Sequence, residues 1–447
     1  MSRTFASLRY LNYRLWFAGA LVSNVGTWMQ RIAQDWLVLT VLTADSGMAV
    51  GLVTALQFLP FLIFSPYAGL IADRMNQRTL LILTQAASGA LALGLGVLVL
   101  FGHVQLWHVY IFAFALGIAS AFDGPVRQTF VTTLVPTASL PNAVALNSAS
   151  FNAARLIGPG AAGVMIAWVG TGWLFLINGF TFMATIAALL AMRTSQLHPQ
   201  DRAPRGKNQV REGVRYLRRR PDLVMIMVIM AVVSALGLNF QLTSALMARV
   251  EFGRDAGEYG LLGSVLAIGS LSGALWAARR KRPRLRVIVG AAGAFGVMLG
   301  VLALAPTYAW FAVACIPVGL TSLMLLTTAN AWMQTTTAPA MRGRVMALYM
   351  MVLMGATPVG APLVGWIGEN VAARWSIGVG AIGSLAVAIV AAAWAMSFWR
   401  IELSLAMHRP FVRAEFGRTT SEAEAAERER ARLELQEQAI EDRRRQA

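Results

Sequence analysis

Apolar runs long enough to cross a lipid bilayer follow one another along almost the whole chain. A transmembrane helix needs about 20 predominantly apolar residues. The sequence predicts such helices at 14–42, 48–70, 79–101, 106–134, 141–168, 171–192, 222–248, 258–278, 286–305, 308–336, 343–367 and 373–399. The first run lacks a small-residue cleavage site after a short apolar core, so we expect it to be retained. With 57% hydrophobic and 13% charged residues, the composition is not that of a soluble globular protein. We therefore predict an all-α integral membrane protein with twelve transmembrane helices.

Basic residues are distributed unevenly between the gaps that separate these runs. Of the 38 Lys and Arg residues, 22 precede the first run, lie in the even-numbered gaps or stand at the edge of a run beside one of these segments, and ten follow the last run. Only Arg249, Arg254 and Arg374 lie in the gaps on the opposite side or at the edge of a run beside them. Because cytoplasmic loops carry the excess of Lys and Arg, both termini are predicted to be cytoplasmic. The net charge of +17 is then a consequence of topology and does not indicate a nucleic acid partner.

The fifth and eleventh runs resemble each other. Both are interrupted by Gly and Pro, and three residues recur at one constant offset: Leu146, Gly158 and Gly163 correspond to Leu348, Gly360 and Gly365. Internal repeats of this kind are typical of transporters built from two related halves. We therefore expect two pseudo-symmetric six-helix bundles. The expected segments are the amino-terminal bundle (1–192), a basic cytoplasmic linker (193–221), the carboxy-terminal bundle (222–400) and a charged cytoplasmic tail that is expected to be helical (401–447).

Asp, Glu, Lys and Arg residues well inside the apolar runs occur only in the first half: Arg31, Asp35, Asp123, Arg127 and Arg155. A charge at bilayer depth is costly, so such residues usually face the bundle interior or water and mark a transport pathway. Arg31 and Asp35 are four residues apart, as are Asp123 and Arg127, so each pair can form within one helix. A self-neutralised structural pair is therefore the alternative to a functional role.

Two neutral amides share helix faces with these charges. On a period of 3.6 residues, Asn24 lies on the face of Arg31 and Asp35, and Asn152 lies on the face of Arg155. A carboxyl group at bilayer depth can carry a proton, because its protonation responds to burial and to nearby charges. The candidates for proton coupling or for the substrate cavity are Asp35, Asp123, Arg31, Arg127, Arg155, Asn24 and Asn152.

The short turn between the second and third runs has the sequence GLIADRMNQR, from Gly69 to Arg78. It resembles the signature loop of the major facilitator superfamily, approximately G-x-L-A-D-R-x-G-R-R, which is matched at Gly69, Asp73, Arg74 and Arg78. In that family the acid and the arginines form a cytoplasmic charge network that stabilises the outward-open state, and the resemblance implies this role here. Asn76 stands where the family has Gly. Asn readily replaces Gly at a left-handed backbone position, so we expect the turn to persist.

The fifth run contains the sequence GPGAAG, in which Gly158, Pro159 and Gly163 reduce side-chain bulk and remove a backbone donor. Small residues let a neighbouring helix approach closely, and Pro frees a backbone carbonyl. The run resembles the helix-five element of proton antiporters of the same superfamily. Together with the preceding residues from 125 onward, it resembles the branch that contains enterobactin-type siderophore exporters and macrolide efflux pumps. The resemblance covers about residues 8–400 and implies a transporter of the bacterial inner (cytoplasmic) membrane.

The sequence contains no recognisable catalytic apparatus. There is no GxxxxGK[ST] phosphate-binding loop, and the four His residues lack metal-ligand spacing. The single Cys315 cannot form an intrachain disulfide. We therefore expect no enzyme activity, no metal and no cofactor. The expected partners are a small-molecule substrate, protons and the lipid bilayer, and we expect the chain to act as a monomer.

The favoured function is that of a secondary active transporter: a proton-coupled antiporter that exports an amphipathic small molecule, a siderophore or a drug, by alternating access. Three bases against two acids favour an anionic substrate, and Met346, Met350 and Met354 can provide adaptable apolar contact. The alternative is an importer or lipid transporter of the same fold that exchanges no proton. A third alternative, a non-transporting sensor that signals through its tail, does not require intramembrane charge.

Overall fold

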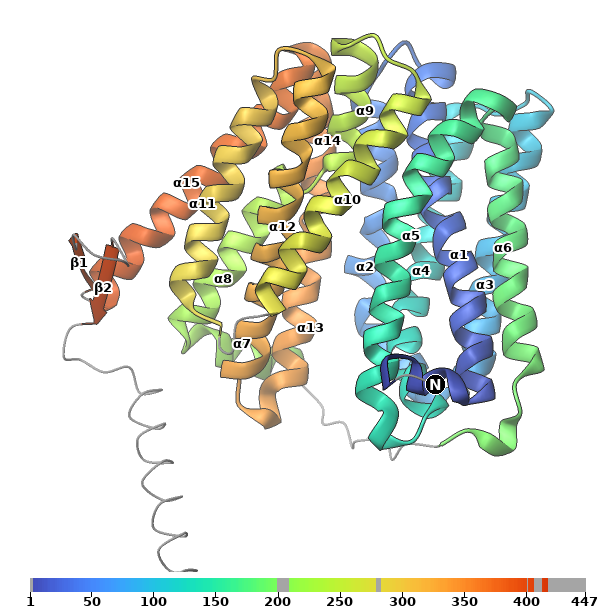
Figure 1. The fold of residues 1–447 in the computed structure, drawn as a ribbon, viewed down its shortest axis with the longest axis horizontal. Coiled ribbons are helices and arrows are strands. Elements are labelled where there is room, and N and C mark those ends of the chain that lie inside the picture. Colours follow the sequence, from blue (N-terminus) through green and yellow to red (C-terminus); the bar gives the residue numbers. More distant parts are fainter. Residues whose placement is uncertain (1–2, 199–208, 279–282, 400, 406–411, 417–447) are drawn as a thin grey trace, which may run out of the picture. The chain divides into compact units, whose positions relative to one another are not determined.

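Helices cover every apolar run that the sequence predicts. The structure is a computed structural model that describes residues 3–198, 209–278, 283–399, 401–405 and 412–416 (Figure 1). Before the linker lie α1 (Leu11–Leu37), α2 (Gly47–Arg74), α3 (Gln77–Leu100), α4 (Leu106–Leu134), α5 (Leu140–Val169) and α6 (Thr171–Ala191). After it come α7 (Gln209–Arg218), α8 (Pro221–Val232), α9 (Phe240–Leu246), α10 (Ala256–Ala278), α11 (Leu285–Ala303), α12 (Tyr308–Thr336), α13 (Pro339–Gly355), α14 (Thr357–Asn370) and α15 (Ala373–Trp399). Short 3-10 or π-helical segments are η1 (Arg3–Arg9), η2 (Val38–Leu42), η3 (Thr137–Ser139), η4 (Thr194–Gln196), η5 (Val233–Gly237) and η6 (Met247–Glu251).

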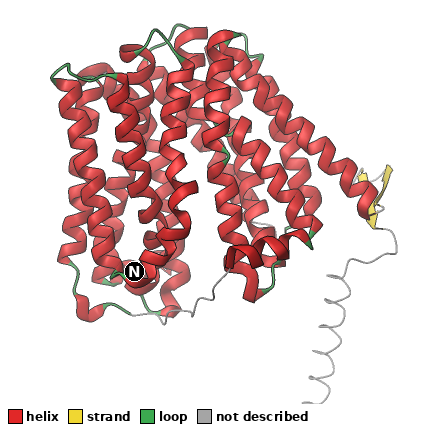
Figure 2. Cartoon of the chain, turned by 180° about the vertical axis from the view of Figure 1, so that it is seen from behind, coloured by secondary structure: helices red, strands yellow, loops and turns green. Residues whose placement is uncertain are grey.

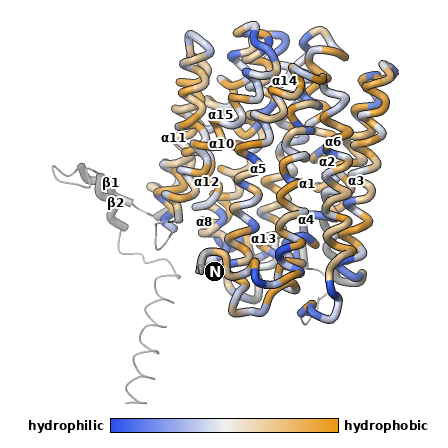
Figure 3. Tube along the Cα trace, turned by 45° about the vertical axis from the view of Figure 1, so that its right-hand side comes forward, coloured by the Kyte–Doolittle hydropathy of each residue, from blue (hydrophilic) through white to orange (hydrophobic). Residues whose placement is uncertain are grey.

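Ten helical stretches in the described part of the chain are long and apolar enough to cross a membrane. Figure 3 shows apolar residues along the helices and hydrophilic residues mainly at the helix ends. α1 and α5, with 27 and 30 residues, are also long enough to cross a membrane. They are not among the ten, because polar side chains such as Arg31, Asp35 and Arg155 lower their mean hydropathy. The protein is therefore a helical, multi-pass membrane protein, although length and composition alone do not reach the predicted count of twelve spans.

Contacts divide the chain into two compact units, Met1–Val387 and Ala388–Ala447. In the first unit, α1 packs against α5 and α6, α3 against α4 and α6, and α2 against α4, while α12 packs against α10 and α11. The helices before the linker meet those after it most extensively where α2 packs against α14 and where α5 packs against α10 (Figure 1). We call the end of this unit where α1 begins and α6 ends the linker end. The distal end is the one where α1 continues through η2 into α2.

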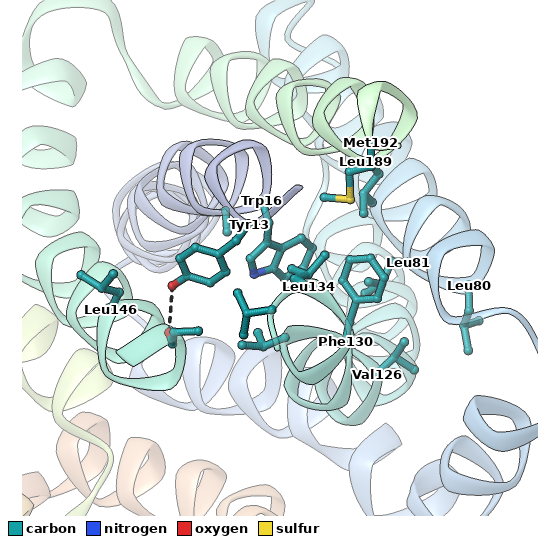
Figure 4. Close-up of a cluster of buried hydrophobic side chains, with 14 residues drawn as sticks. Tyr13, Trp16, Leu80, Leu81, Val126, Phe130, Leu134, Leu146, Leu189 and Met192 are labelled. Atoms are coloured by element: carbon teal, nitrogen blue, oxygen red, sulfur yellow. Dashed lines mark hydrogen bonds between the residues drawn. The ribbon is translucent and has the colours of Figure 1, made fainter. Parts of the chain in front are cut away.

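Aromatic side chains fix the linker end of α1 against α4 and α5. Trp16 of α1 is buried, and its ring meets that of Phe130 of α4 edge-on, with ring centroids 5.3 Å apart (Figure 4). The Tyr13 hydroxyl donates a hydrogen bond of 2.8 Å to the carbonyl oxygen of Ala143 in α5. Edge-to-face aromatic pairs are favourable beyond the area that they bury. Asp35 lies at the opposite end of α1, two residues before the helix ends at Leu37.

Charged residues anchor the helices that follow the linker. Arg220 immediately precedes α8 and donates two hydrogen bonds, of 2.9 and 2.7 Å, to the carboxylate of Asp222. Trp332 of α12 donates to the same carboxylate at 3.1 Å. Arg344 of α13 forms an ion pair with Glu212 of α7. These bonds fix α7 and α8 against α12 and α13 at the linker end.

The second unit begins within α15 and continues into an antiparallel hairpin of β1 (Ile401–Leu405) and β2 (Val412–Phe416) (Figure 2). The prediction of a helical tail is wrong for these two segments. Apolar and polar residues alternate along both, which is the period of a strand, and Leu403 pairs with Ala414. A spacing that favours a helix, Glu424 four residues before Arg428, occurs only after Arg418, and residues 417–447 lie outside the described part of the chain.

Candidate functional site

The carboxyl group of Asp35 is buried near the distal end of α1, where 7% of the residue is exposed. The Tyr259 hydroxyl of α10 donates a hydrogen bond of 3.2 Å to Asp35 Oδ2. The Tyr259 ring also stacks on Trp36, with centroids 5.7 Å apart. The predicted ion pair between Asp35 and Arg31 is not among those that the described residues form, because the Arg31 guanidinium lies against aromatic rings instead. Asp35 therefore links a helix that precedes the linker to one that follows it.

Arg31 and Arg155 approach the same aromatic ring from two helices. The Cζ atom of Arg31 lies 5.1 Å from the centroid of Trp28, and that of Arg155 lies 5.8 Å from it. Arg31 Cζ also lies 5.9 Å from the ring of Phe58 in α2. Within the described chain, neither guanidinium is ion-paired with a carboxylate. Aromatic faces stabilise cations through their quadrupole, which explains how the two charges are accommodated here.

The two predicted amides have less specific surroundings. Asn24 is half-buried on α1, and the Asn152 side chain donates a hydrogen bond of 2.8 Å to the carbonyl oxygen of Ser148, one turn earlier in α5. A buried amide pair that the sequence did not single out, Asn178 donating to Gln30, connects α6 to α1. The structure thus brings Arg155 to Arg31 but places Asn152 in a local contact.

Asp123 belongs to a separate polar cluster between α3 and α4. Arg127 Nε donates to Asp123 Oδ2 at 2.7 Å, which confirms the ion pair that the spacing predicted. Thr84 and Gln85 of α3 donate to the other carboxylate oxygen at 2.9 and 2.8 Å. Arg127 Cζ lies 5.3 Å from the Trp16 ring. Both oxygens of Asp123 are therefore satisfied by helices of the first half, as in a structural pair.

Only part of the signature loop can be placed. Gly69, Asp73 and Arg74 lie outside the residues whose surroundings are described, so their role stays a prediction. Arg78 donates hydrogen bonds of 2.7 and 3.0 Å to the carbonyl oxygens of Leu189 and Leu190, at the carboxy-terminal end of α6. A cation at this position satisfies the last carbonyls and complements the helix dipole.

Asn76 has a different role from the one predicted. Its backbone is extended, with φ −64° and ψ 122°, so it does not occupy a left-handed position. Its side-chain oxygen accepts hydrogen bonds from the backbone N–H groups of Arg78 and Thr79 and caps the first turn of α3. Asn is among the preferred residues at this position because it satisfies otherwise unpaired backbone donors.

The helix-five element forms the contact between α5 and α10. A side chain at Gly163 would meet the carbonyl oxygen of Ala256 at 2.6 Å, and one at Gly158 would meet the Trp28 side chain at 2.6 Å. Next to Pro159, the Ser264 hydroxyl of α10 accepts from Gly160 N at 3.1 Å and donates to the Leu156 carbonyl oxygen at 2.7 Å. Ser264 is therefore inserted between two backbone groups of α5 that are spaced to bond each other in a regular helix.

The glycines repeated in the eleventh run make equivalent contacts. A side chain at Gly360 would meet the carbonyl oxygen of Ala235 in η5, and one at Gly365 would meet that of Gly47 in α2. Gly158 and Gly360, the first glycines of the two runs, thus each face the first span of their own half. Gly163 and Gly365, the second glycines, each face the second span of the other half. Only Gly permits backbones to approach this closely.

Polar groups also join the two sets of helices at the distal end. Glu369 of α14 accepts hydrogen bonds from Ser46 Oγ at 2.7 Å and from the backbone N–H of Met48 at 2.9 Å, and so caps the first turn of α2. Arg249 of η6 forms an ion pair of 3.2 Å with Asp45. A carboxylate at a helix amino terminus is favoured by the helix dipole.

Tyr259, Ser264 and Glu369, which join the two sets of helices, are among the residues that sequence reasoning missed. The signal for Tyr259 was a phenol hydroxyl within an apolar run, since such a group normally requires a polar partner. Ser264 and Glu369 carried no comparable signal, because Ser is common in membrane helices and Glu369 lies at a helix end.

The described residues share their fold with known membrane transporters. The chain matches a bacterial homolog of the human lysosomal transporter Spinster, solved in an inward-facing and unoccupied conformation, with a TM-score of 0.61 and 17% identity over 86% of this chain and 96% of that one. It matches a D-xylose–proton symporter with a TM-score of 0.65 and 12% identity over 86% and 96% of the two chains. These similarities show that the chain shares its fold with these two transporters.

A family model described as transmembrane secretion effector matches residues 2–420, and the chain belongs to this family of membrane transporters. The multidrug efflux pump Tap of Mycolicibacterium fortuitum is 28% identical over 77% of this chain and 86% of its own. The staphyloferrin A transporter of Staphylococcus aureus is 24% identical over 78% and 88%, and the enterobactin exporter EntS of Citrobacter koseri is 23% identical over 78% and 82%. The predicted superfamily and branch are confirmed, and the family consists of transporters, not enzymes.

Proposed function

We propose that this protein is a proton-coupled efflux antiporter that exports an amphipathic small molecule, a siderophore or a drug, by alternating access. The names of its relatives, a multidrug efflux pump and an enterobactin exporter, support the direction and the substrate class. In this proposal α1 and α5 also span the membrane, giving twelve spans in two halves, 1–192 and 222–400, joined by the linker 193–221. The linker end and both termini are cytoplasmic, as the basic residues indicate, and the chain acts as a monomer.

The observation that carries the proposal is the place where the two halves meet. The described residues form hydrogen bonds between the halves only towards the distal end, and these involve Asp35 with Tyr259, Ser46 and Met48 with Glu369, Asp45 with Arg249, and Gly160 and Leu156 with Ser264. With a cytoplasmic linker end, this conformation is closed towards the outside. A typical hydrogen bond contributes about 0.5–1.5 kcal/mol net, so such a set can separate during a transport cycle.

The repeated glycines support the division into pseudo-symmetric halves. Gly163 brings α5 to the second span of the other half, and Gly365 brings α14 to α2 in the equivalent way. Transporters of this kind alternate access by rocking related halves around a fixed site, which requires matched contacts at the two seams. The two glycine contacts supply such a matched pair.

Asp35 is the group best placed for proton coupling. When the distal contacts separate, Tyr259 leaves the carboxylate, which then meets water on the outside. A protonated carboxyl group costs far less to bury than a carboxylate, so uptake of a proton favours closure of the distal end around an empty site. Arg31, one turn nearer the linker end, lies within electrostatic range and stabilises the carboxylate once the proton leaves towards the cytoplasm.

The direct test compares transport with and without a pH gradient. A comparison of metabolites exported by cells that carry or lack the chain identifies a substrate, which is then followed in inside-out membrane vesicles. An acidic lumen is expected to drive accumulation of the compound, and collapse of the gradient is expected to abolish accumulation. Equal accumulation without a gradient would exclude proton antiport, and movement out of the vesicles would favour the importer.

Glu369→Ala is expected to weaken the distal closure. The variant removes both hydrogen bonds to the start of α2, and since the site is partly open to solvent we expect the distal-open population to rise about fivefold, corresponding to about 1 kcal/mol. Spin labels at the exposed residues Ala44 and Val371, in a Cys315→Ala background, report the separation of the two distal loops by pulsed electron paramagnetic resonance.

Glu258→Ala is the matched control for this measurement. Glu258 is also at the distal end, but its ion pair, 4.0 Å to Arg254, lies within one half. Its loss is expected to leave the distance between the labels unchanged. A distribution that is the same in the Glu369 variant as in the parent protein would argue against a closing role for Glu369.

A further inference from the structure

We propose that Trp28, Arg31, Phe58 and Arg155 form the binding site for the head of an amphipathic aromatic carboxylate. This inference rests on the proposed function, because it assigns the exported substrate to a chemical class and to named residues. The four residues come from α1, α2 and α5, so the site lies at the meeting point of three helices of the first half. We refer to these residues as the arginine–aromatic cluster.

The charges of the arginine–aromatic cluster are unbalanced. Of the three arginines within the spans of the first half, Arg127 is ion-paired with Asp123 at 2.7 Å. Arg31 and Arg155 lie within electrostatic range of each other, yet neither is ion-paired within the described chain. Asp35 is near Arg31, but its Oδ2 atom accepts a hydrogen bond from Tyr259. Two cations and one carboxylate leave an excess positive charge that a bound anion would neutralise.

The cost of this excess charge indicates a ligand. Arginines at bilayer depth are rare and nearly always pair with acids or with backbone carbonyls. Two guanidinium groups that are not ion-paired repel each other, and aromatic faces compensate only in part, by about 0.5–2 kcal/mol for each contact. A carboxylate fits both guanidinium groups, because the planar fork of arginine matches its two oxygens.

The aromatic rings define the apolar part of the ligand. The rings of Trp28 and Phe151 meet edge-on, with centroids 6.0 Å apart. The ring centroids of Phe58 and Phe61 are 6.1 Å apart. Phe151 is 47% exposed although its ring meets that of Trp28, so the Phe151 ring retains a free surface. A fused aromatic ring can pack on these faces while its carboxylate reaches Arg31 and Arg155. A cation of the same shape would be repelled by both arginines.

The test measures equilibrium binding of 2-naphthoate, and of its neutral analogue 2-naphthamide, to the full chain in lipid nanodiscs by calorimetry, with empty nanodiscs subtracted. We expect the parent protein to bind naphthoate at least about tenfold more tightly than naphthamide, because charge-assisted bonds to two guanidinium groups are lost in the amide. Arg31→Gln and Arg155→Gln are each expected to weaken naphthoate binding about tenfold without changing naphthamide binding.

Two further variants keep the result interpretable. Arg155→Lys retains the charge and is expected to recover part of the preference for naphthoate, even if the Gln variant folds poorly. Arg254→Gln is the matched control, because Arg254 also lies over an aromatic ring, 5.5 Å from the Tyr308 centroid, but has Glu258 as an acidic partner. It is expected to leave both affinities unchanged.

Equal affinities of the parent protein for naphthoate and naphthamide would overturn the assignment. So would Arg155 variants that lose both ligands equally, since that pattern indicates a structural role. No gradient is present in this assay, so its outcome is independent of proton coupling. Selective naphthoate binding without gradient-driven transport would support the binding site and exclude proton antiport. Gradient-driven transport without selective naphthoate binding would exclude the binding site alone.

Discussion

Replacement of Asp35 by Asn is expected to uncouple transport from the proton gradient while leaving exchange of substrate intact. Asn retains an oxygen that can accept the hydrogen bond from Tyr259, so the contact between α1 and α10 can still form. It cannot carry a proton, and the difference between burying a charged and a neutral group is lost. In inside-out vesicles we expect gradient-driven accumulation to fall at least about tenfold. Exchange of labelled for unlabelled substrate, without a gradient, should continue.

Asp123→Asn is the matched control for Asp35→Asn. Asp123 carries the same charge in the same half, but Arg127, Thr84 and Gln85 already satisfy its oxygens. The Asn variant leaves a largely buried guanidinium without its acid, which we expect to cost about 3 kcal/mol of stability. A lowered thermal transition with retained coupling is therefore expected. If both variants transport as the parent protein does, neither acid belongs to the mechanism.

Tyr259 is expected to adjust this coupling rather than to determine it. Tyr259→Phe removes one donor to Asp35 but retains the stacking on Trp36, with its centroid separation of 5.7 Å in the parent protein. A smaller effect than that of Asp35→Asn would place the proton on the carboxyl group. An equal effect would instead indicate that the bond between α1 and α10 is the essential feature.

The helices could be predicted because they depend on local composition. Each apolar run of spanning length is helical, since the backbone must satisfy its own hydrogen bonds in a bilayer. The ion pair between Asp123 and Arg127 was predictable for the same reason, because the two residues are one turn apart in a single helix. The same spacing did not produce an ion pair at Arg31, because Trp28 and Phe58 offer its guanidinium aromatic faces.

The partners of the key residues could not be predicted, because they lie far away in the sequence. Tyr259 reaches Asp35, and Ser264 reaches the backbone of Leu156, only after α10 has packed against α5. Nothing in the local pattern specifies which helices become neighbours. Asn76 shows a different limit: the residue type was consistent both with a left-handed turn and with a helix cap, and the structure has the cap.

Gly163→Ala is expected to disfavour closure of the distal end and to reduce transport. The added methyl group would lie 2.6 Å from the carbonyl oxygen of Ala256 and 3.0 Å from Gly257, so α5 and α10 must move apart. Overpacking of this kind costs about 1–3 kcal/mol, and a shift of about 2 kcal/mol changes the ratio of two states roughly thirtyfold. Labels at Ala44 and Val371 should then report a longer distance, and transport should fall at least about tenfold.

The repeated sequence supplies both a second case and a control for this prediction. Gly365→Ala would bring a methyl group against the backbone of Gly47, so we expect it to affect the α2 and α14 seam as Gly163→Ala affects the α5 and α10 seam. Gly257→Ala lies in the same contact, but its side chain would meet nothing within 4 Å and should leave transport and distances unchanged. A methyl group at Gly163 would clash with α10 only while the distal end is closed. A longer distance between the two labels therefore indicates a shift towards the distal-open conformation, which a loss of folding would not produce. Unchanged distances in both seam variants would mean that these contacts do not set the closed state.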